Sequence, residues 1–174
     1  IMYAGSGYIV DRLGTRRGFA LFSFIWSLSQ VLHGLVAGKW SLAACRSLLG
    51  LSEPGNFPAA VKAVGEWFPE SQRALGVGIF NAGSSLGAAL AAPLSAWVAL
   101  HFGWRAAFVV TGTLGFCWLF FWLLFYQPPE KNRWLRTSER VAISDLPKPA
   151  LARRSSWVRT LCSRACLTLM LMRF

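Results

Sequence analysis

The chain has 174 residues, of which 55% are hydrophobic and 14% are charged, and its mean hydropathy is +0.44. This composition excludes an ordinary soluble domain and indicates a helical membrane protein. The formal net charge of +11 would suggest nucleic-acid binding in a soluble protein. Here the basic residues lie mainly in short connections on one side of the apolar runs, which is the positive-inside pattern of membrane proteins.

The cysteines predict neither a disulfide framework nor a zinc site. Cys45 and Cys117 fall within apolar runs, while Cys162 and Cys166 have neither a CxxC spacing nor a neighbouring histidine. We therefore expect no metal and no cofactor.

Both ends of the chain predict a fragment of a larger membrane protein. Ile1 is not an initiator, and no signal peptide is visible. The segment 161–174 opens like another apolar helix but stops short of the roughly 20 residues that a membrane-spanning helix needs.

The first charged segment follows an apolar run, Ile1–Val10, that we interpret as the last turns of a spanning helix. It is predicted to be a loop over Asp11–Arg17 and carries the pattern GxxxDRxGxRR. The pattern consists of Gly7, Asp11, Arg12, Gly14, Arg16 and Arg17. Glycine permits close helix contact at its first position and a tight turn at its second, and the charged groups can bond to neighbouring helix ends.

This pattern resembles the motif between the second and third helices of the major facilitator superfamily. The resemblance implies a position on the cytoplasmic side and a role as a conformational latch. A basic loop that only orients the protein in the membrane is the alternative.

Phe19–Ala37 is the next predicted span, with Gly38–Trp40 as its outer turn. His33 lies near the end of this span. A histidine near the end of a span is more often a hydrogen-bonded interface residue than a proton carrier, and both roles stay open for His33.

Ser41–Glu66 is long and apolar enough to cross a bilayer, yet it contains Arg46 and Glu53. Seven positions apart at about 100° per residue, the two side chains share one helix face. Charges at bilayer depth each cost about 2.5–3.5 kcal/mol on insertion scales, so they normally mark an ion or substrate pathway. A structural pair tying helices together, or side chains that snorkel, is the alternative. Pro54 and Pro58 predict a bend close to Glu53.

Ala74–Leu100 is a span dense in small residues, and Gly83 with Gly87 forms a GxxxG pair that predicts tight helix packing. Asn81, Ser84 and Ser85 lie around one turn of it. They could present hydrogen-bonding groups to a polar solute or bond to neighbouring helices.

His101–Trp104 is predicted to be a short outer turn, and Ala106–Tyr126 a lipid-facing helix. Its aromatic residues Trp118 and Trp122 are better explained as lipid or packing contacts than as a sugar-stacking platform. We thus divide the chain into a transmembrane bundle (1–127), a basic cytoplasmic loop (128–160) and the start of a further apolar segment (161–174). Attraction to anionic lipid explains the basic loop without nucleic-acid binding.

The run from Arg46 to Leu94, with EWFPESQRA and FNAGSSLGA, and the later stretch FVVTGTLGF resemble the anion:cation symporter family of this superfamily. Within that family, the order and spacing of these stretches are most similar to bacterial hexuronate transporters. The resemblance implies an all-α fold of twelve helices in two six-helix halves. This chain then corresponds to the end of helix two through helix six of the N-terminal bundle.

The resemblance also implies proton-coupled import of an organic anion, such as glucuronate or galacturonate, by alternating access across the bacterial inner membrane. It assigns substrate binding to Arg46, Asn81 and Ser84, and proton coupling to Glu53. The expected partners are the anion, the proton and the lipid bilayer, and the missing C-terminal half is needed for transport. Transport of galactonate, glucarate or another organic anion, a non-transporting sensor and an inactive remnant are the alternatives. No nucleophile–base pairing or metal spacing suggests an enzyme.

Overall fold

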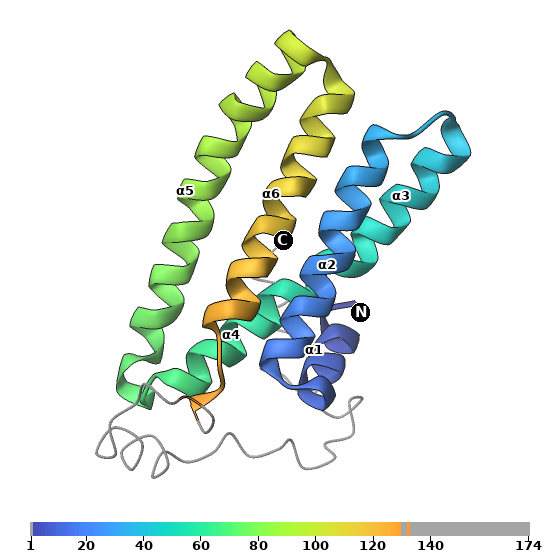
Figure 1. Cartoon of the computed structure of the whole chain (residues 1–174). Helices are drawn as coiled ribbons and strands as arrows, with labels where there is room; N and C mark the ends of the chain where they lie inside the picture. The colour runs from blue at the N-terminus through green and yellow to red at the C-terminus, as the bar shows by residue number, and fades with distance from the viewer. Residues whose placement is uncertain (1, 130–131, 133–174) are drawn as a thin grey trace, which may run out of the picture.

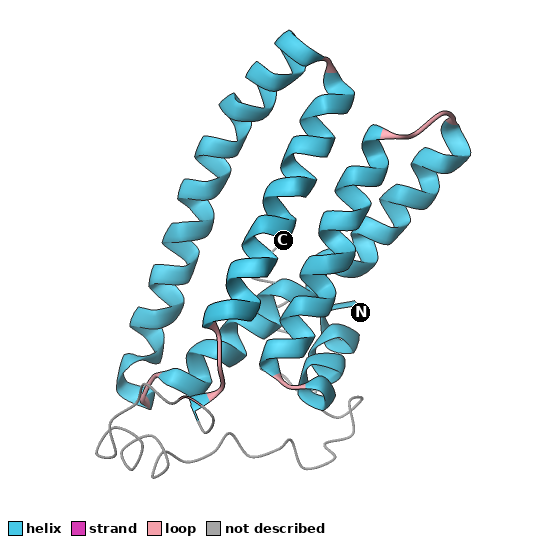
Figure 2. Ribbon diagram, in the orientation of Figure 1, coloured by secondary structure: helices cyan, strands magenta, loops and turns pink. Residues whose placement is uncertain are grey.

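The computed structural model describes residues 2–129 and 132, and every regular element in this part of the chain is a helix (Figures 1 and 2). The elements in chain order are α1 (Met2–Leu13), α2 (Thr15–Gly34), α3 (Lys39–Ser52), the 3₁₀ helix η1 (Glu53–Gly55), α4 (Asn56–Trp67), α5 (Glu70–Phe102) and α6 (Trp104–Phe125). The predicted all-α fold is confirmed. Except for three residues, the predicted loop 128–160 and the apolar segment 161–174 lie outside the described residues.

Helix α2 lies between α6 and α3 and also contacts α1, η1 and α4 (Figure 1). Glycine makes the α2–α6 contact close. A Cβ added to Gly112 of α6 would lie 2.6 Å from Val31 Cγ2 and 2.9 Å from the Ser27 carbonyl oxygen of α2. Gly115, one turn further along α6, faces the Ser27 side chain in the same way. Small residues therefore bring these two backbones together.

Within the described residues, Gly7, Gly83 and Gly87 do not make the close helix contacts predicted for them. A Cβ added at any of these positions would meet no atom within 4 Å. The α1–α2 contact forms at Gly18 instead, where an added Cβ would lie 3.0 Å from the Cα of Val10. A small residue only permits close approach, and the partner helix must also lie across that face.

Two turns consist of a single glycine. Gly14 separates α1 from α2 with φ +78°, and Gly103 separates α5 from α6 with φ +85°. Only glycine adopts this left-handed backbone without strain. The predicted tight turn at Gly14 is confirmed, but the loop over Asp11–Arg17 is wrong, because the residues on both sides of Gly14 are helical. The outer turn predicted over His101–Trp104 likewise shrinks to Gly103.

The predicted long helix Ser41–Glu66 is broken. The chain forms α3, passes through the 3₁₀ turn at Glu53–Gly55 and continues as α4 (Figure 1). Proline lacks the backbone N–H that an α-helix needs and clashes with the preceding turn. The α-helix is thus interrupted where Pro54 and Pro58 predict a bend, and Glu53 begins the interrupting turn.

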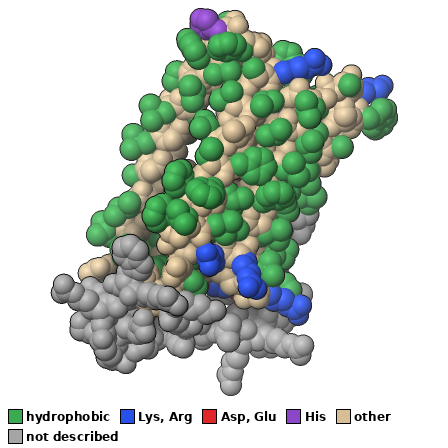
Figure 3. Space-filling model, viewed as in Figure 1, with side chains coloured by type: hydrophobic (Ala, Val, Ile, Leu, Met, Phe, Trp, Pro, Cys, Tyr) green, Lys and Arg blue, Asp and Glu red, His purple; other side chains and the backbone are tan. Residues whose placement is uncertain are grey.

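Helices α5 and α6 are both long and apolar enough to cross a membrane. Only 6% and 11% of their most apolar 18-residue stretches are buried against the rest of the protein. The exposed large hydrophobic residues include Leu90, Trp118 and Phe125. Figure 3 shows hydrophobic side chains along the visible face and lysine and arginine at its two ends. An apolar surface between polar ends suits a lipid bilayer, and exposed Trp118 fits the predicted lipid contact.

His33 is a packed, hydrogen-bonded residue. Its side chain is 1% exposed, its Nδ1 lies 2.7 Å from the Ser29 carbonyl oxygen, and its ring stacks on Phe108 of α6 at 5.1 Å between centroids. Because a carbonyl oxygen only accepts, Nδ1 carries the proton in this contact. The interface role predicted for His33 is confirmed.

Candidate functional site

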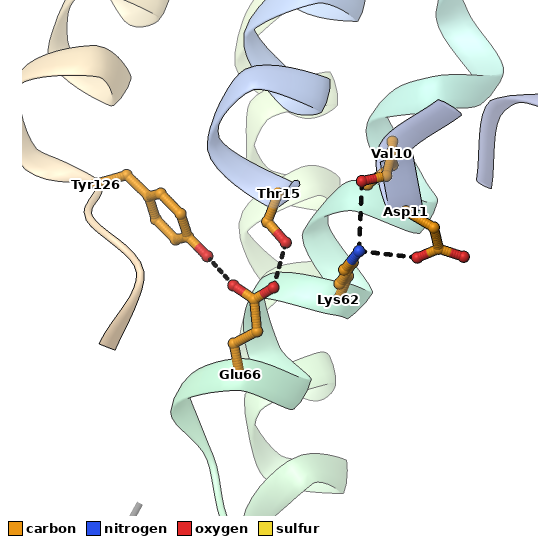
Figure 4. Close-up of polar contacts among 6 residues, drawn as sticks. All are labelled: Val10, Asp11, Thr15, Lys62, Glu66 and Tyr126. Carbon is orange, nitrogen blue, oxygen red and sulfur yellow. Dashed lines mark hydrogen bonds and ion pairs between the residues drawn. The ribbon is translucent and has the colours of Figure 1, made fainter. Parts of the chain in front are cut away.

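The charged motif at the α1–α2 turn binds α4 through an ion pair. Nζ of Lys62 lies 2.8 Å from Oδ1 of Asp11, and the same ammonium group donates to the Val10 carbonyl oxygen at 3.3 Å (Figure 4). Asp11 is thus positioned by the last turn of α1, and its partner comes from a helix about fifty residues later in the chain. Sequence reasoning did not include Lys62 in the motif.

Glu66 forms a second contact at the same end of the bundle. Its carboxylate accepts hydrogen bonds from Thr15 Oγ1 at the start of α2 and from the Tyr126 hydroxyl after α6, the latter at 2.7 Å (Figure 4). Burial, and then the hydrogen bond to the Glu66 carboxylate, raise the pKa of Tyr126 above that of an ordinary phenol. Glu66 therefore ties together three elements: α2, α4 and the end of α6.

Arg16 of the motif reaches the C-terminal end of α6. Its guanidinium donates to the Leu123 carbonyl oxygen, and its own carbonyl oxygen accepts a bond from Trp122 Nε1 at 3.2 Å. The Trp122 ring stacks on that of Tyr126 at 4.0 Å, so this tryptophan makes the predicted packing contact. Cations are favoured near a helix C-terminus, where carbonyl groups lack partners within the helix.

The α4–α5 turn is closed by Arg73. Its guanidinium donates to the carbonyl oxygens of Phe68 and Gly65 and pairs with Glu70 at 3.5 Å. These bonds satisfy carbonyl groups at the end of α4. Asp11, Glu66 and Arg73 thus each take part in joining helix ends on this side of the bundle.

Arg46 and Glu53, the predicted intramembrane charges, lie on α3 and η1, and both are exposed. They do not form an ion pair with each other, since the ion pairs found among the described residues are Asp11–Lys62 and Glu70–Arg73. Nothing in the described part thus supports their alternative role as a structural pair. Both remain accessible to a solute or to other helices.

Asn81 and Ser84 are exposed on α5. The neighbouring Ser85 hydroxyl donates to the Asn81 carbonyl oxygen of its own helix at 3.1 Å. Figure 1 shows α5 and α3 on opposite sides of α6 and α2. Within the described residues, no hydrogen bond links Asn81 or Ser84 to Arg46 or Glu53, so their predicted role as a joint substrate site stays a prediction.

Lys62 and Glu66 are the functional candidates that sequence reasoning missed. They are charged residues four positions apart on one face of an otherwise apolar helix. The same argument that singled out Arg46 and Glu53 applies to them. Thr15 and Tyr126 carry no such signal, because hydroxyl groups at helix ends are common.

Comparison with known proteins gives a consistent picture. The family model of the Major Facilitator Superfamily matches residues 1–174. The chain is 41% identical over 140 residues to a galacturonate transporter of Dickeya chrysanthemi. The aligned part makes up 80% of this chain and 41% of that protein. It is 40% identical over 141 residues to a hexuronate transporter of Escherichia coli strain K12, covering 80% and 32% of the two chains.

A D-galactonate transporter of Escherichia coli O6:H1 is 34% identical over 139 residues, covering 80% of this chain and 32% of that protein. The chain therefore spans roughly a third to two fifths of the length of these curated relatives.

Proposed function

Because the chain belongs to the Major Facilitator Superfamily and is therefore part of a multi-pass helical membrane protein, we propose that the whole protein imports a sugar acid together with protons. Import would occur by alternating access across the bacterial inner membrane. The observation that carries this proposal is the similarity to transporters named for galacturonate, hexuronate and D-galactonate. All of these substrates are sugar-derived carboxylates. A hexuronate is our first candidate, because the two relatives with the higher identity are named for that class.

Arg46 is suited to bind the substrate. A guanidinium group stays charged under all ordinary conditions and can bind a carboxylate through two parallel hydrogen bonds. Arg46 is exposed and has no acidic partner among the described residues. The carboxylate of a sugar acid would therefore be the acidic partner that Arg46 lacks.

Glu53 is suited to carry the proton. It is exposed at the broken segment η1, and it too has no ion-pair partner among the described residues. In a partly dry cavity an ionised carboxylate is costly, so uptake of a proton would neutralise it when the substrate leaves or enters. Asn81 and Ser84 of α5 would add hydrogen bonds to the substrate hydroxyl groups once the other helices complete the cavity.

The motif residues would control access from the cytoplasmic side. Asp11 binds α4 and Arg16 binds the end of α6. These contacts therefore depend on how the helix ends are arranged. Gly7, Arg12, Gly14 and Arg17 complete the motif, with Gly14 forming the turn. Rocking of one half against the other would make and break such contacts during transport.

The experiment is uptake of labelled glucuronate, galacturonate, galactonate and glucarate by the full-length protein in vesicles with an imposed inward proton gradient. Accumulation that is selective for hexuronates and disappears when the gradient is collapsed is the expected result. Gradient-dependent uptake of another acid would keep the mechanism and change the substrate. No uptake of any of the four acids would contradict the proposed function.

A further inference from the structure

The 3₁₀ turn that carries Glu53 is supported from behind by α1. In a continuous α-helix the carbonyl oxygen of Pro54 would accept a bond from the N–H of residue 58, but Pro58 has no N–H. The Ser6 hydroxyl of α1 takes that place, donating to the Pro54 carbonyl oxygen at 3.1 Å. Ser6 is 4% exposed, so water is poorly placed to replace it. Its hydroxyl donates to a carbonyl group whose usual helical donor, the N–H four residues on, is removed by the proline.

Helix α2 supports the residue after the turn. Ser23 Oγ donates to the side-chain oxygen of Asn56 at 3.1 Å, and Asn56 is the first residue of α4. Ser23 is also buried, at 5% exposed. The two serines therefore tie consecutive parts of the break to two different helices.

A third contact fixes how closely the turn approaches α2. Gly55 lies over the ring of Phe22, so closely that an added Cβ would lie 2.0 Å from Cγ. Phe22 in turn belongs to the buried cluster with Val10 and Ala59. We call Ser6, Phe22 and Ser23 the η1 seat, because together they contact the three residues that follow Glu53.

Glu53 itself makes no side-chain hydrogen bond or ion pair to the η1 seat in the described part of the chain, and its side chain is exposed. Its backbone nevertheless begins the turn that the seat holds. We propose that Ser6 and Ser23 are positioning residues for Glu53, and that their hydroxyl groups set where its carboxylate stands. This inference rests on the proposed function, in which Glu53 exchanges the transported proton.

Loss of either hydroxyl has a specific expected consequence. The Pro54 carbonyl or the Asn56 amide would lose a buried partner, and the turn would shift to find another. Displacement of a reacting group by a fraction of an ångström to an ångström strongly lowers the rate of the step it performs. Substrate binding at Arg46, on the regular helix α3, depends less on this turn.

The test compares two activities of the full-length protein in vesicles, with the sugar acid that it accumulates. Proton-driven accumulation requires Glu53 to exchange its proton, whereas counterflow exchange of substrate does not require net proton movement. In Ser6→Ala and Ser23→Ala, accumulation should fall on the order of tenfold, while counterflow at equal protein amount stays within about twofold. Ser23→Thr keeps the hydroxyl and should restore the ratio of the two activities.

Ser29→Ala is the matched control. Ser29 is a buried serine on the same helix as Ser23, and its hydroxyl donates to the Cys45 carbonyl oxygen of α3 at 2.8 Å. The substitution removes an equivalent interhelical hydrogen bond away from the break. It should leave the ratio of accumulation to counterflow unchanged even if it lowers thermal stability.

The outcomes separate the two proposals. If the unaltered protein shows no proton-driven accumulation, the proposed function fails, and the role given to Ser6 and Ser23 fails with it. If the unaltered protein accumulates substrate and the serine variants lose both activities equally, or lose neither, the positioning role alone is overturned. Because Ser23 bonds to Asn56, the variant Asn56→Ala should have the same effect as Ser23→Ala, and combining the two should add little.

Discussion

Lys62 of α4 and Asp11 at the end of α1 form an ion pair whose nitrogen and oxygen atoms lie 2.8 Å apart, with side chains 25% and 59% exposed. Solvent screens a pair this accessible, so its contribution to stability is small. It joins the charged motif to a helix that continues directly from the Glu53 turn. The pair is therefore better suited to favour one arrangement of the helices over another during transport than to stabilise the folded protein.

Asp11→Asn should separate these two roles. The free energy of unfolding should fall by less than about 1 kcal/mol, because exposed ion pairs contribute little. The initial rate of substrate uptake should fall at least about fivefold, the lower end of typical coupling between states. Thermal unfolding in detergent and uptake in vesicles measure the two quantities.

Glu70→Gln provides the comparison for Asp11→Asn, since it removes the other ion pair, Glu70–Arg73, which lies within one turn of α5. Neither stability nor uptake should change appreciably in that variant. A loss of several kcal/mol in Asp11→Asn, with uptake reduced only in proportion to the folded protein, would contradict the gating role.

Tyr126→Phe should weaken the contact between α4 and the end of α6. The variant loses the hydroxyl that donates to Glu66, while Thr15 still bonds to the same carboxylate. We expect a loss of about 1–2 kcal/mol in the free energy of unfolding, typical of a partly buried hydrogen bond to a charged group. Thr113→Val is the control, because that exposed hydroxyl bonds only within α6. Equal stability of Tyr126→Phe and the unaltered protein would contradict the role of this bond.

The same tyrosine predicts a dependence on alkaline pH. Burial and the Glu66 contact raise the pKa of Tyr126 in the folded state above its ordinary value of about 10. Its contribution to stability is then fully present below about pH 10 and is lost as the pH rises toward the folded-state pKa. The stability advantage of the unaltered protein over Tyr126→Phe should therefore shrink between about pH 10 and 12. A difference that stays constant over that range would contradict the raised pKa.

The sequence predicted the helices and the break at Glu53 because both depend on local chemistry. Apolar runs of sufficient length form spans, and Pro54 and Pro58 remove N–H groups wherever the segment packs. The Glu66 contacts could not be predicted in this way. Glu66 bonds to Thr15 and Tyr126, which are 51 and 60 residues away in the chain. A local pattern identifies the face of a helix but not the helix that meets it.

The glycine residues illustrate the same limit. The GxxxG pair on α5 is the stronger motif, yet Gly112 on α6 makes the close contact with α2. Gly112→Ala should lower the free energy of unfolding by about 1–3 kcal/mol, because the new methyl group would press on backbone atoms that cannot move freely. Gly78→Ala on α5 has open space around it and should be neutral or slightly stabilising. Equal effects of the two substitutions, measured by thermal unfolding, would contradict the packing described for α2 and α6.

Arg46→Lys should reveal whether Arg46 binds the carboxylate of the substrate. The positive charge remains, but the planar pair of donors is lost, so we expect KM for uptake to rise about tenfold with the maximal rate changed less. Arg105→Lys, at the start of α6 and outside both the motif and the proposed substrate site, is the control for a general effect of replacing arginine. A KM equal to that of the unaltered protein would exclude Arg46 from direct substrate binding.

Glu53→Gln should separate proton coupling from substrate binding. Glutamine has the same size but cannot carry a proton away, so proton-driven accumulation should be abolished. Counterflow exchange should persist at a rate within about threefold of the unaltered protein, because substrate can still enter and leave the site. Glu70→Gln is the control for a general loss of one carboxylate, and it should retain both activities. Equal loss of accumulation and exchange in correctly folded Glu53→Gln protein would mean that Glu53 acts in substrate binding, and a normal accumulation would mean that another group carries the proton.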